Sequence, residues 1–301
     1  ENYKNNIFFK KESSQVTGSF KWRGVLYSVM NTFEQLKDIQ INQSEPYYLV
    51  TQSTGNHGIA VIHAVQEIKK YYCKKYPIDK KKWENIYACV FSNIFITQPK
   101  IDKINKLLEK DKKSIFDCTP KNYNEALKKR EYFLETHQGK YMSHGGKDIM
   151  TGYGSLAHEI MQQVPSDKSV TMITAIGAGG PIGVAEYFSY FSNFKLIVSQ
   201  TESFNAFVRS LKCKEIQSNY SNKTPGLSDG IAVDKPEEYA LNTAIKLGIS
   251  GVSVKDIDVE KLQKSTGLGG STCIALAALE KISTNDDIMI VLDCEGNHKE
   301  S

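Results

Sequence analysis

Four short segments of the chain combine glycines with side chains that could bind a ligand or react. They read TGSFKWRG (Thr17–Gly24), STGNHG (Ser53–Gly58), GAGGPIG (Gly177–Gly183) and LDCEGN (Leu292–Asn297). Turns of this composition leave backbone N–H groups open to an anion, and hydroxyl and amide side chains suit a carboxylate. The chemistry that they suggest is the binding of a phosphate and a carboxylate, together with an amine and a thiol that could take part in a reaction.

Taken one at a time, these residues also have plainer interpretations. Lys21 opens an amphipathic helix, where the helix dipole lowers the pKa of an amine and favours its nucleophilic form, yet alone it is more typical of a surface lysine. STGNHG could be a helix cap with a glycine turn, and His57 is expected to be a hydrogen-bonded structural histidine rather than a base. GAGGPIG favours phosphate binding over mere close packing, and Cys294 could be a buried structural cysteine.

The elements that must position these segments alternate between strand and helix. Short β-rich runs are predicted to be strands at Tyr47–Gln52, Ile86–Phe91, Ser114–Asp117, Thr171–Ile176, Lys195–Thr201 and Asp287–Asp293. Amphipathic stretches are predicted to be helices at Lys21–Leu36, Gly58–Tyr72, Pro99–Glu109, Asn124–Thr136 and Leu156–Val164. This rhythm predicts an α/β fold with parallel sheets flanked by helices. In such sheets ligands bind where strands end and helices begin, which is where the four segments lie.

Composition excludes several classes of protein. The 301 residues carry 38 basic and 34 acidic side chains, a net charge of +4, and 40% of residues are hydrophobic, so disorder and coiled coil are excluded. All but three of the bases are scattered lysines, which disfavours a nucleic-acid partner. Six widely spaced cysteines without a CxxC pair argue against zinc and disulfides. No apolar run could cross a membrane. A cytoplasmic location is expected, although a start at Glu1 rather than Met leaves an N-terminal targeting segment open.

The order and spacing of the four segments together resemble one family. Lys21 in its GSFKxRG context, STGNHG 32 residues later, the glycine-rich loop and the CxGN end of a strand are similar to fold-type II pyridoxal-phosphate enzymes, in particular the serine/threonine dehydratase and serine racemase branch. Smaller matches are GYGSLAHEI (Gly152–Ile160), SDG (Ser228–Gly230) and GLGG (Gly267–Gly270). The resemblance covers nearly the whole chain, and it implies a two-domain fold of the tryptophan synthase β type.

The resemblance assigns roles to residues of this chain. It implies that Lys21 forms the Schiff base with pyridoxal 5'-phosphate, beside Phe20, and that Cys294 faces the pyridine nitrogen. The residues that would bind the cofactor phosphate through their amides are Gly177, Ala178, Gly179 and Gly180. Asn56 would bond the ring hydroxyl and contact the substrate. The residues that would hold the substrate carboxylate are Ser53, Thr54, Gly55 and His57.

These roles imply dehydration and deamination of a small hydroxy amino acid to a 2-oxo acid and ammonia. A neutral thiol at the pyridine nitrogen favours departure of a β leaving group over transamination. Racemisation needs a second acid–base group, for which Thr54 is the candidate, so an amino-acid racemase remains an alternative. Less favoured alternatives are a β-replacement enzyme and a non-catalytic pyridoxal-binding protein. Whether the substrate is serine, threonine or a β-hydroxylated acid is left open, and Tyr153, His144 and Lys147 are candidates for that choice.

The same resemblance predicts how the chain is divided and assembled. A large cofactor-binding domain is expected to comprise residues 1–44 and 146–301, and a small domain of residues 45–145 is expected to bind the substrate carboxylate. A homodimer is expected. No metal site is expected, because the cation site of some relatives needs two carboxylates. Here the possible pairs are Gln200 with Ala206 or Glu202 with Val208.

Overall fold

The computed structural model describes residues 6–219, 230–282 and 286–296. The chain folds into two compact units, one formed by Glu1–Arg23 with His144–Ser301 and the other by Gly24–Ser143. The first unit is therefore discontinuous in sequence, and the second is one continuous segment. The domain limits and domain roles expected from sequence remain predictions.

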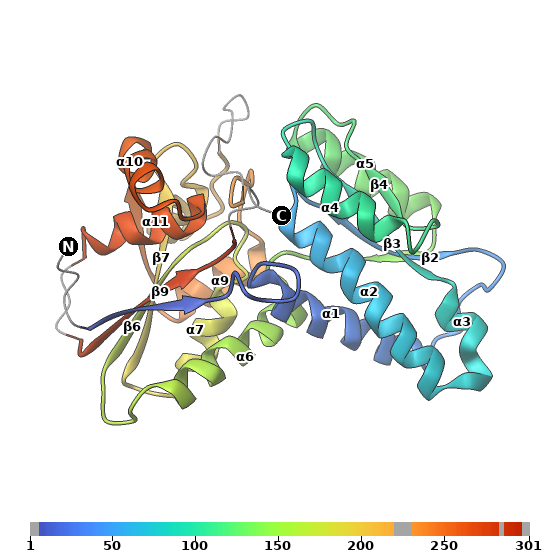
Figure 1. The fold of residues 1–301 in the computed structure, drawn as a ribbon, viewed down its shortest axis with the longest axis horizontal. Coiled ribbons are helices and arrows are strands. Elements are labelled where there is room, and N and C mark those ends of the chain that lie inside the picture. Colours follow the sequence, from blue (N-terminus) through green and yellow to red (C-terminus); the bar gives the residue numbers. More distant parts are fainter. Residues whose placement is uncertain (1–5, 220–229, 283–285, 297–301) are drawn as a thin grey trace. The chain divides into compact units, whose positions relative to one another are not determined.

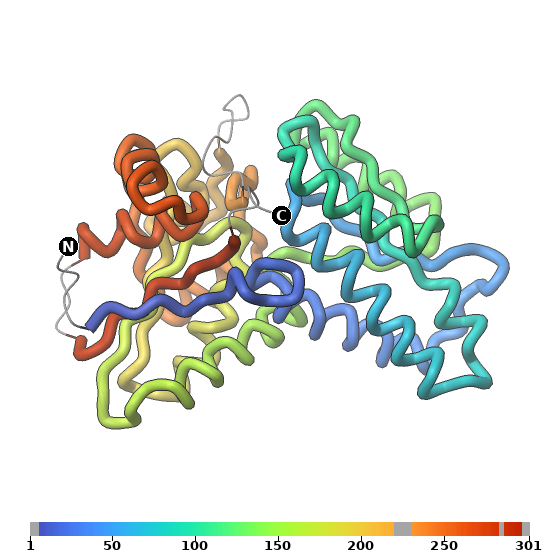
Figure 2. Tube along the Cα trace, in the orientation of Figure 1, coloured from blue at the N-terminus to red at the C-terminus, as the bar shows by residue number. Residues whose placement is uncertain are grey.

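The first unit is built on a five-stranded parallel sheet (Figure 1). Its strands, in spatial order, are β1 (Ile7–Lys11), β9 (Ile288–Asp293), β6 (Val170–Ala175), β7 (Phe194–Thr201) and β8 (Ser250–Val254). Every residue of β6 is buried, as expected for a strand covered by helices on both faces. The blue and red traces that run side by side in Figure 2 are β1 and β9, which pair in parallel from Ile7–Met289 to Lys11–Asp293.

Helices cover both faces of this sheet. They are α6 (Lys147–Gln163), α7 (Ile182–Phe188), α8 (Ala206–Cys213), α9 (Glu238–Lys246), α10 (Asp256–Thr266) and α11 (Gly270–Leu279). In Figure 1, α10 and α11 lie on one side of the sheet and α6 and α7 on the other. α11 is apolar all round, and its residues 271–278 are buried. A Cβ on Gly183 would lie 2.0 Å from the Met150 carbonyl oxygen, so this glycine permits α7 to pack closely on α6.

The second unit has a four-stranded parallel sheet in the order β4, β3, β2, β5. These strands are β2 (Tyr47–Gln52), β3 (Ile86–Phe91), β4 (Ile115–Asp117) and β5 (Gly139–Tyr141). The helices are α2 (Asn56–Lys75), α3 (Lys80–Glu84), α4 (Gln98–Leu108) and α5 (Tyr123–Thr136), with a short 3₁₀ helix at Pro77–Asp79. α2 and α4 pack together on one face of the sheet, and α5 contributes to the core on the other.

Helix α1 (Lys21–Leu36) begins in the first unit and continues into the second. Its buried residues recur every three or four positions, as in an amphipathic helix with one face in the core. Phe33 on that face stacks on Trp83 of α3, with ring centroids 5.8 Å apart. Trp83, which follows the lysine-rich stretch Lys69–Lys82, is buried.

The predicted α/β fold with parallel sheets is confirmed, and most predicted elements lie within three residues of their observed limits. The prediction of a helix at Leu156–Val164 was too short, because α6 already begins at Lys147 and passes through Gly152 and Gly154. Strands β1, β5 and β8 were not predicted. The described part of the chain contains no helix that is both long and apolar enough to cross a membrane.

Candidate active site

Lys21 is brought next to Cys294 by the pairing of two segments from opposite ends of the sequence. After β1 and β9 end, the backbone N–H of Phe20 donates to the Cys294 carbonyl oxygen at 3.0 Å. Gly296 donates to the Gly18 carbonyl oxygen at 3.1 Å, and Ser19 forms an antiparallel bridge with Glu295. Two of the segments singled out in the sequence, TGSFKWRG and LDCEGN, thus form one structure at the carboxyl end of the sheet.

The amine of Lys21 is held at a defined place. Its Nζ donates to the Gly230 carbonyl oxygen at 3.0 Å, and the side chain is half-buried in the first turn of α1. Two residues on, the Arg23 guanidinium makes a bidentate contact of 2.7 and 2.8 Å with the Glu12 carboxylate and a 2.5 Å contact with Glu159. Glu12 is only 1% exposed, so this ion pair fixes the start of α1 from within the unit.

The Cys294 thiol is buried and uncharged. Its Sγ lies 3.7 Å from the Thr174 hydroxyl oxygen and donates to the Leu292 carbonyl oxygen at 3.5 Å. Burial raises the pKa of this thiol to about 12, although the Thr174 hydroxyl and the Lys21 charge act in the opposite direction. At neutral pH the group facing this corner of the unit is therefore a neutral thiol.

The glycine-rich loop follows β6 and leads into α7. Gly179 has a φ of +132°, and a Cβ there would lie 2.2 Å from the Ala240 Cβ, so both backbone and packing require glycine. None of the four amides from Gly177 to Gly180 donates a hydrogen bond to another residue that the structure describes. Four such N–H groups in succession form a cradle that suits a phosphate, with oxygen acceptors supplied by the ligand.

Tyr153 of α6 connects this loop to the Lys21 segment. Its ring lies 5.1 Å, centroid to centroid, from the ring of Phe20, and a Cβ on Gly180 would meet its Cε2 at 2.6 Å. Tyr153 is 2% exposed. Its observed role is thus to pack between Phe20 and the glycine loop in the core of the unit.

The STGNHG segment lies in the second unit, between the end of β2 and the start of α2. The Ser53 hydroxyl oxygen accepts from the amides of Gly55, at 3.1 Å, and Gly58, at 3.0 Å, which holds the turn in shape. Asn56 is the first residue of α2 and is buried. His57 is 2% exposed, and its Nε2 lies 3.2 Å from the Met142 carbonyl oxygen, which corresponds to the structural role expected for this histidine. Thr54 is the one residue of positions 51–60 that is partly exposed.

A lysine that sequence reasoning did not select lies against this segment. Lys100 of α4 is 5% exposed, and a Cβ on Gly55 would lie 2.3 Å from its Cδ. Gly55 has a φ of +148°, a backbone conformation that L side chains rarely adopt. The only signal in the sequence is a lysine in the first turn of a helix, where the dipole disfavours a cation.

The other predicted candidates have different positions, and His144 lies against the glycine-rich loop, since a Cβ on Gly180 would meet its carbonyl oxygen at 3.1 Å. His144 donates its backbone N–H to the Glu237 carboxylate at 3.4 Å, and Lys147 is exposed at the start of α6. Ser228, Asp229 and Asn297 are outside the described residues.

At the position considered for a cation, the Gln200 side-chain oxygen accepts the Val208 amide at 3.0 Å, and Glu202 is exposed. Within the described ranges, no group of three or more potential ligand residues could hold a metal ion.

The sequence is similar to known proteins over part of their length. Human serine racemase is 30% identical over 184 residues, which is 60% of this chain and 45% of the relative. L-threonine ammonia-lyase of Thermotoga maritima is 26% identical over 262 residues, 84% of this chain and 56% of the relative. The chain thus spans about half the length of these relatives.

Solved structures share the fold. Maize serine racemase superposes with a TM-score of 0.75 at 18% identity, over 97% of this chain and 83% of that one. Threonine deaminase isoform 2 of Solanum lycopersicum superposes with a TM-score of 0.72 at 20% identity, over 97% of this chain and 75% of that one. The model of the family described as pyridoxal-phosphate dependent enzymes matches residues 1–293. With a lysine, a neutral thiol and an amide cradle in the first unit, this chain belongs to the pyridoxal-phosphate dependent enzymes of fold type II.

Proposed function

We propose that the protein eliminates the β-hydroxyl group of a small hydroxy amino acid such as L-serine or L-threonine as water. Hydrolysis of the released enamine then takes up one water and gives a 2-oxo acid and ammonia. The observation that carries this proposal is the hydrogen bond that joins Phe20 to Cys294, because it sets the reactive amine of Lys21 beside a neutral thiol. The similarity to an L-threonine ammonia-lyase supports the same activity.

The first unit supplies the groups that would hold pyridoxal 5'-phosphate. The amides of Gly177, Ala178, Gly179 and Gly180 would bind its phosphate, and Phe20 would lie against its ring. Lys21 would hold it covalently through its ε-amine, as a Schiff base. Cys294 would face the pyridine nitrogen, where its thiol, with a pKa of about 12, brings no negative charge.

Lys21 would also move protons once its amine no longer holds the cofactor. The freed ε-amine would take the proton from the substrate Cα and would deliver a proton to the departing hydroxyl group. The bound cofactor would supply the electron sink for the pair that the Cα proton leaves behind. The neutral Cys294 thiol would not protonate the pyridine nitrogen, which would favour loss of the β-hydroxyl group over transamination.

The second unit would recognise the substrate. Ser53, Thr54, Gly55 and His57 would surround its carboxylate at the start of α2, and Asn56 would bond the cofactor's ring hydroxyl. Since Ser53 already accepts the amides of Gly55 and Gly58, its contribution to a carboxylate would be its hydroxyl hydrogen. Two copies of the chain are proposed to form a homodimer.

The test is a product assay on purified protein with added pyridoxal phosphate. L-serine, L-threonine and L-threo-3-hydroxyaspartate are offered separately, and both 2-oxo acid and D-amino acid are scored. A 2-oxo acid without the D-isomer is the expected result. If no substrate gave either product, the proposal would be contradicted. That result would favour a β-replacement enzyme or a binding protein.

Racemisation is a second candidate, favoured by one observation. Thr54 is the one partly exposed residue in the stretch 51–60, which favours its hydroxyl over the buried neighbours as a second proton donor and acceptor. Formation of the D-isomer at a rate comparable to the 2-oxo acid would support this candidate. Thr54→Ala would then abolish the D-isomer and spare the 2-oxo acid, whereas Thr54→Ser would retain both.

A further inference from the structure

Three carboxylates are buried among the residues that the structure describes, and each lies near Lys21 or Cys294 in the sequence. They are Glu12, Asp293 and Glu295. Acidic side chains are almost never buried without partners, because removing a charge from water is costly. Glu12 has such a partner in the guanidinium that fixes the start of α1. The two carboxylates at the end of β9 need an explanation of their own.

Asp293 and Glu295 differ in what surrounds them. Asp293 accepts the hydroxyl groups of Ser13, in the loop after β1, and of Thr272 in α11, so it joins these elements to the end of β9. Glu295 accepts the Ser271 hydroxyl at 3.0 Å in the first turn of α11, where the positive end of the helix dipole favours a negative charge. The hydroxyl group and the dipole both favour the ionised form of the Glu295 carboxylate.

Gly230 connects the Glu295 carboxylate to the amine of Lys21. A Cβ on Gly230 would lie 2.8 Å from the Glu295 Oε1 atom, so the carboxylate packs directly against this backbone. The carbonyl oxygen of the same glycine accepts the Lys21 amine at 3.0 Å. Burial is the main cause of the raised pKa of the Cys294 thiol, and the Glu295 charge adds to it whereas the Lys21 charge opposes it. The two charges therefore act within one small region of the first unit.

Other titratable side chains come from the elements packed around Lys21. They are Glu12, Arg23, Tyr153, Glu159, Asp293 and Cys294. The arginine is paired with both glutamates, and the tyrosine and the thiol stay neutral at neutral pH because burial raises the pKa of each. The aspartate is bonded to two hydroxyl groups. Among the described carboxylates, Glu295 is thus the one that contacts the residue holding the Lys21 amine.

We propose that Glu295 is a positioning residue, whose buried negative charge holds the proton on the Lys21 nitrogen. A nearby negative charge favours the charged form of a nitrogen base, and in a buried, weakly screened position this effect extends over several ångströms. The inference rests on the proposed function, in which Lys21 carries the cofactor, and it deepens it by naming the residue that sets the pH range in which this nitrogen stays protonated.

The test follows the visible absorbance of the cofactor-loaded protein as the pH is varied, without any substrate. This absorbance reports whether the nitrogen that joins Lys21 to the cofactor carries a proton. Glu295→Gln removes the charge and keeps the shape of the side chain, whereas Glu295→Asp keeps the charge. Asp293→Asn neutralises the other buried carboxylate of this strand end and is the matched control. Glu295→Ala is a second neutral variant for use if Glu295→Gln does not fold.

Glu295→Gln is expected to lower the midpoint of this titration by about one pH unit, which corresponds to a ten-fold weaker hold on the proton. Glu295→Asp and Asp293→Asn are expected to keep most of the wild-type value. An unchanged titration of Glu295→Gln, even with a lower thermal unfolding midpoint, would mean that the carboxylate only caps α11. An equal shift in Asp293→Asn would mean that the effect is not specific to Glu295. Either result overturns the inference.

The failure of the inference can be distinguished from the failure of the proposed function. Because the titration contains no substrate, it gives the same answer whether or not the protein dehydrates L-serine. If the wild type showed no absorbance of covalently bound cofactor, the assignment of Lys21 would be overturned, and the inference with it.

Discussion

The backbone N–H of Phe20 donates to the carbonyl oxygen of Cys294 across 3.0 Å, although 273 residues separate the two in sequence (294 − 20 − 1). This single bond sets the relative position of Lys21, the next residue, and the Cys294 thiol. Because β1 and β9 are neighbours in the sheet, the bond continues a pairing that five residue pairs have already established. The two segments that carry Lys21 and Cys294 thus continue the pairing of the sheet and do not form a separate loop structure.

The first prediction concerns the amine. Lys21→Ala removes the group proposed to hold the cofactor and to move the Cα proton, so activity should fall by about 10³-fold or more. The visible absorbance of protein-bound cofactor should shift to that of the free aldehyde. Lys212→Ala, at the exposed end of α8, serves as the control and should retain both properties. Full activity of Lys21→Ala would contradict the mechanism.

The second prediction concerns the pH dependence of stability. Burial raises the pKa of Cys294 to about 12, above the value near 9 of an unfolded thiol, so the neutral thiol is favoured in the folded state. The contribution of the neutral Cys294 thiol to the free energy of unfolding is therefore complete below about pH 9. It is lost as the pH rises from about 9 towards 12. The free energy of unfolding, measured by urea denaturation across this range, should fall less steeply for Cys294→Ser. Identical slopes would show that the thiol does not titrate as described.

The same pKa predicts chemical reactivity. At pH 8, iodoacetamide should label exposed Cys213 and spare Cys294, because the thiolate is the reactive form. Peptide mass spectrometry of the folded protein measures both sites at once. Labelling of Cys294 as fast as Cys213 would contradict the buried, neutral thiol.

The third prediction concerns the ion pair at the start of α1. Arg23→Gln leaves the Glu12 carboxylate, 1% exposed, without its bidentate partner, and breaking a buried pair in this way costs about 3–5 kcal/mol. Lys70→Gln breaks a solvent-exposed contact to Glu67 and should leave stability almost unchanged. Chemical denaturation of the two variants side by side provides the measurement, and equal stability would place the Arg23 contact among weak surface pairs.

The fourth prediction separates the two reasons for glycine at position 179, in the loop that is proposed to bind phosphate. Gly179→Ala combines a positive φ with a contact of 2.2 Å to the Ala240 Cβ, so it should destabilise the first unit by about 2–4 kcal/mol and weaken cofactor binding. Gly248 also has a positive φ, +64°, but a Cβ there meets nothing within 4 Å. Gly248→Ala should therefore cost only about 1–2 kcal/mol and leave cofactor affinity unchanged. Fluorescence titration with pyridoxal phosphate distinguishes them; equal affinity in both would contradict the loop's role.

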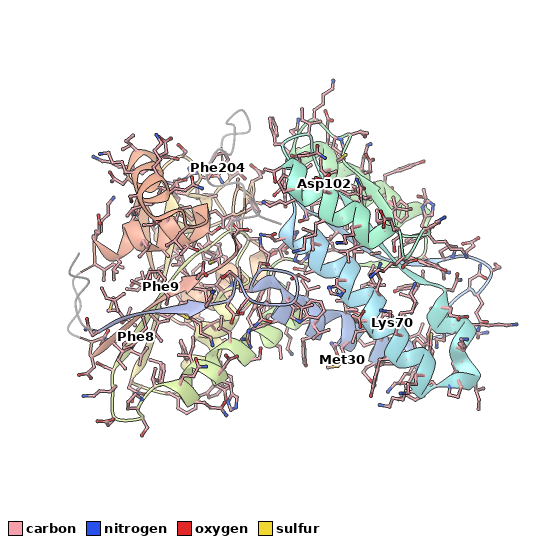
Figure 3. The ribbon with its side chains drawn as sticks, in the orientation of Figure 1. Phe8, Phe9, Met30, Lys70, Asp102 and Phe204 are labelled. Carbon is pink, nitrogen blue, oxygen red and sulfur yellow. The ribbon has the colours of Figure 1, made fainter. Side chains whose placement is uncertain are left out.

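The strands that were predicted correctly share a physical property. β2 and β3 are continuous apolar runs between turn residues, because both of their faces are covered, and such runs are recognisable without any partner. β1 is an edge strand with two lysines in five residues, and its Phe8 and Phe9 are exposed (Figure 3). Its pairing with β9 depends on a contact across almost the whole chain, which local patterns do not encode.

The same distinction applies to the site. The spacing of glycines identified the loop from Gly177, because positions whose backbone conformation or packing excludes a side chain require glycine. Lys21 was identified by its place at a helix start. Lys100 was missed because a lysine on a polar helix ordinarily faces solvent. Only the packing of α4 against the turn at Gly55, 45 positions earlier, turns this lysine inward.

The order of strands in the first unit has a consequence for biosynthesis. The second unit is a continuous segment, so it can fold on the ribosome as soon as residues 24–143 have emerged. In the first unit β9 lies between β1 and β6, so β1 has no sheet partner until residues 288–293 have been translated. Throughout elongation Phe8 and Phe9 belong to a segment that has not yet met its sheet partner. Nascent chains stalled before residue 288 should therefore be the substrates that chaperones bind, with the cofactor able to enter only after synthesis has passed β9.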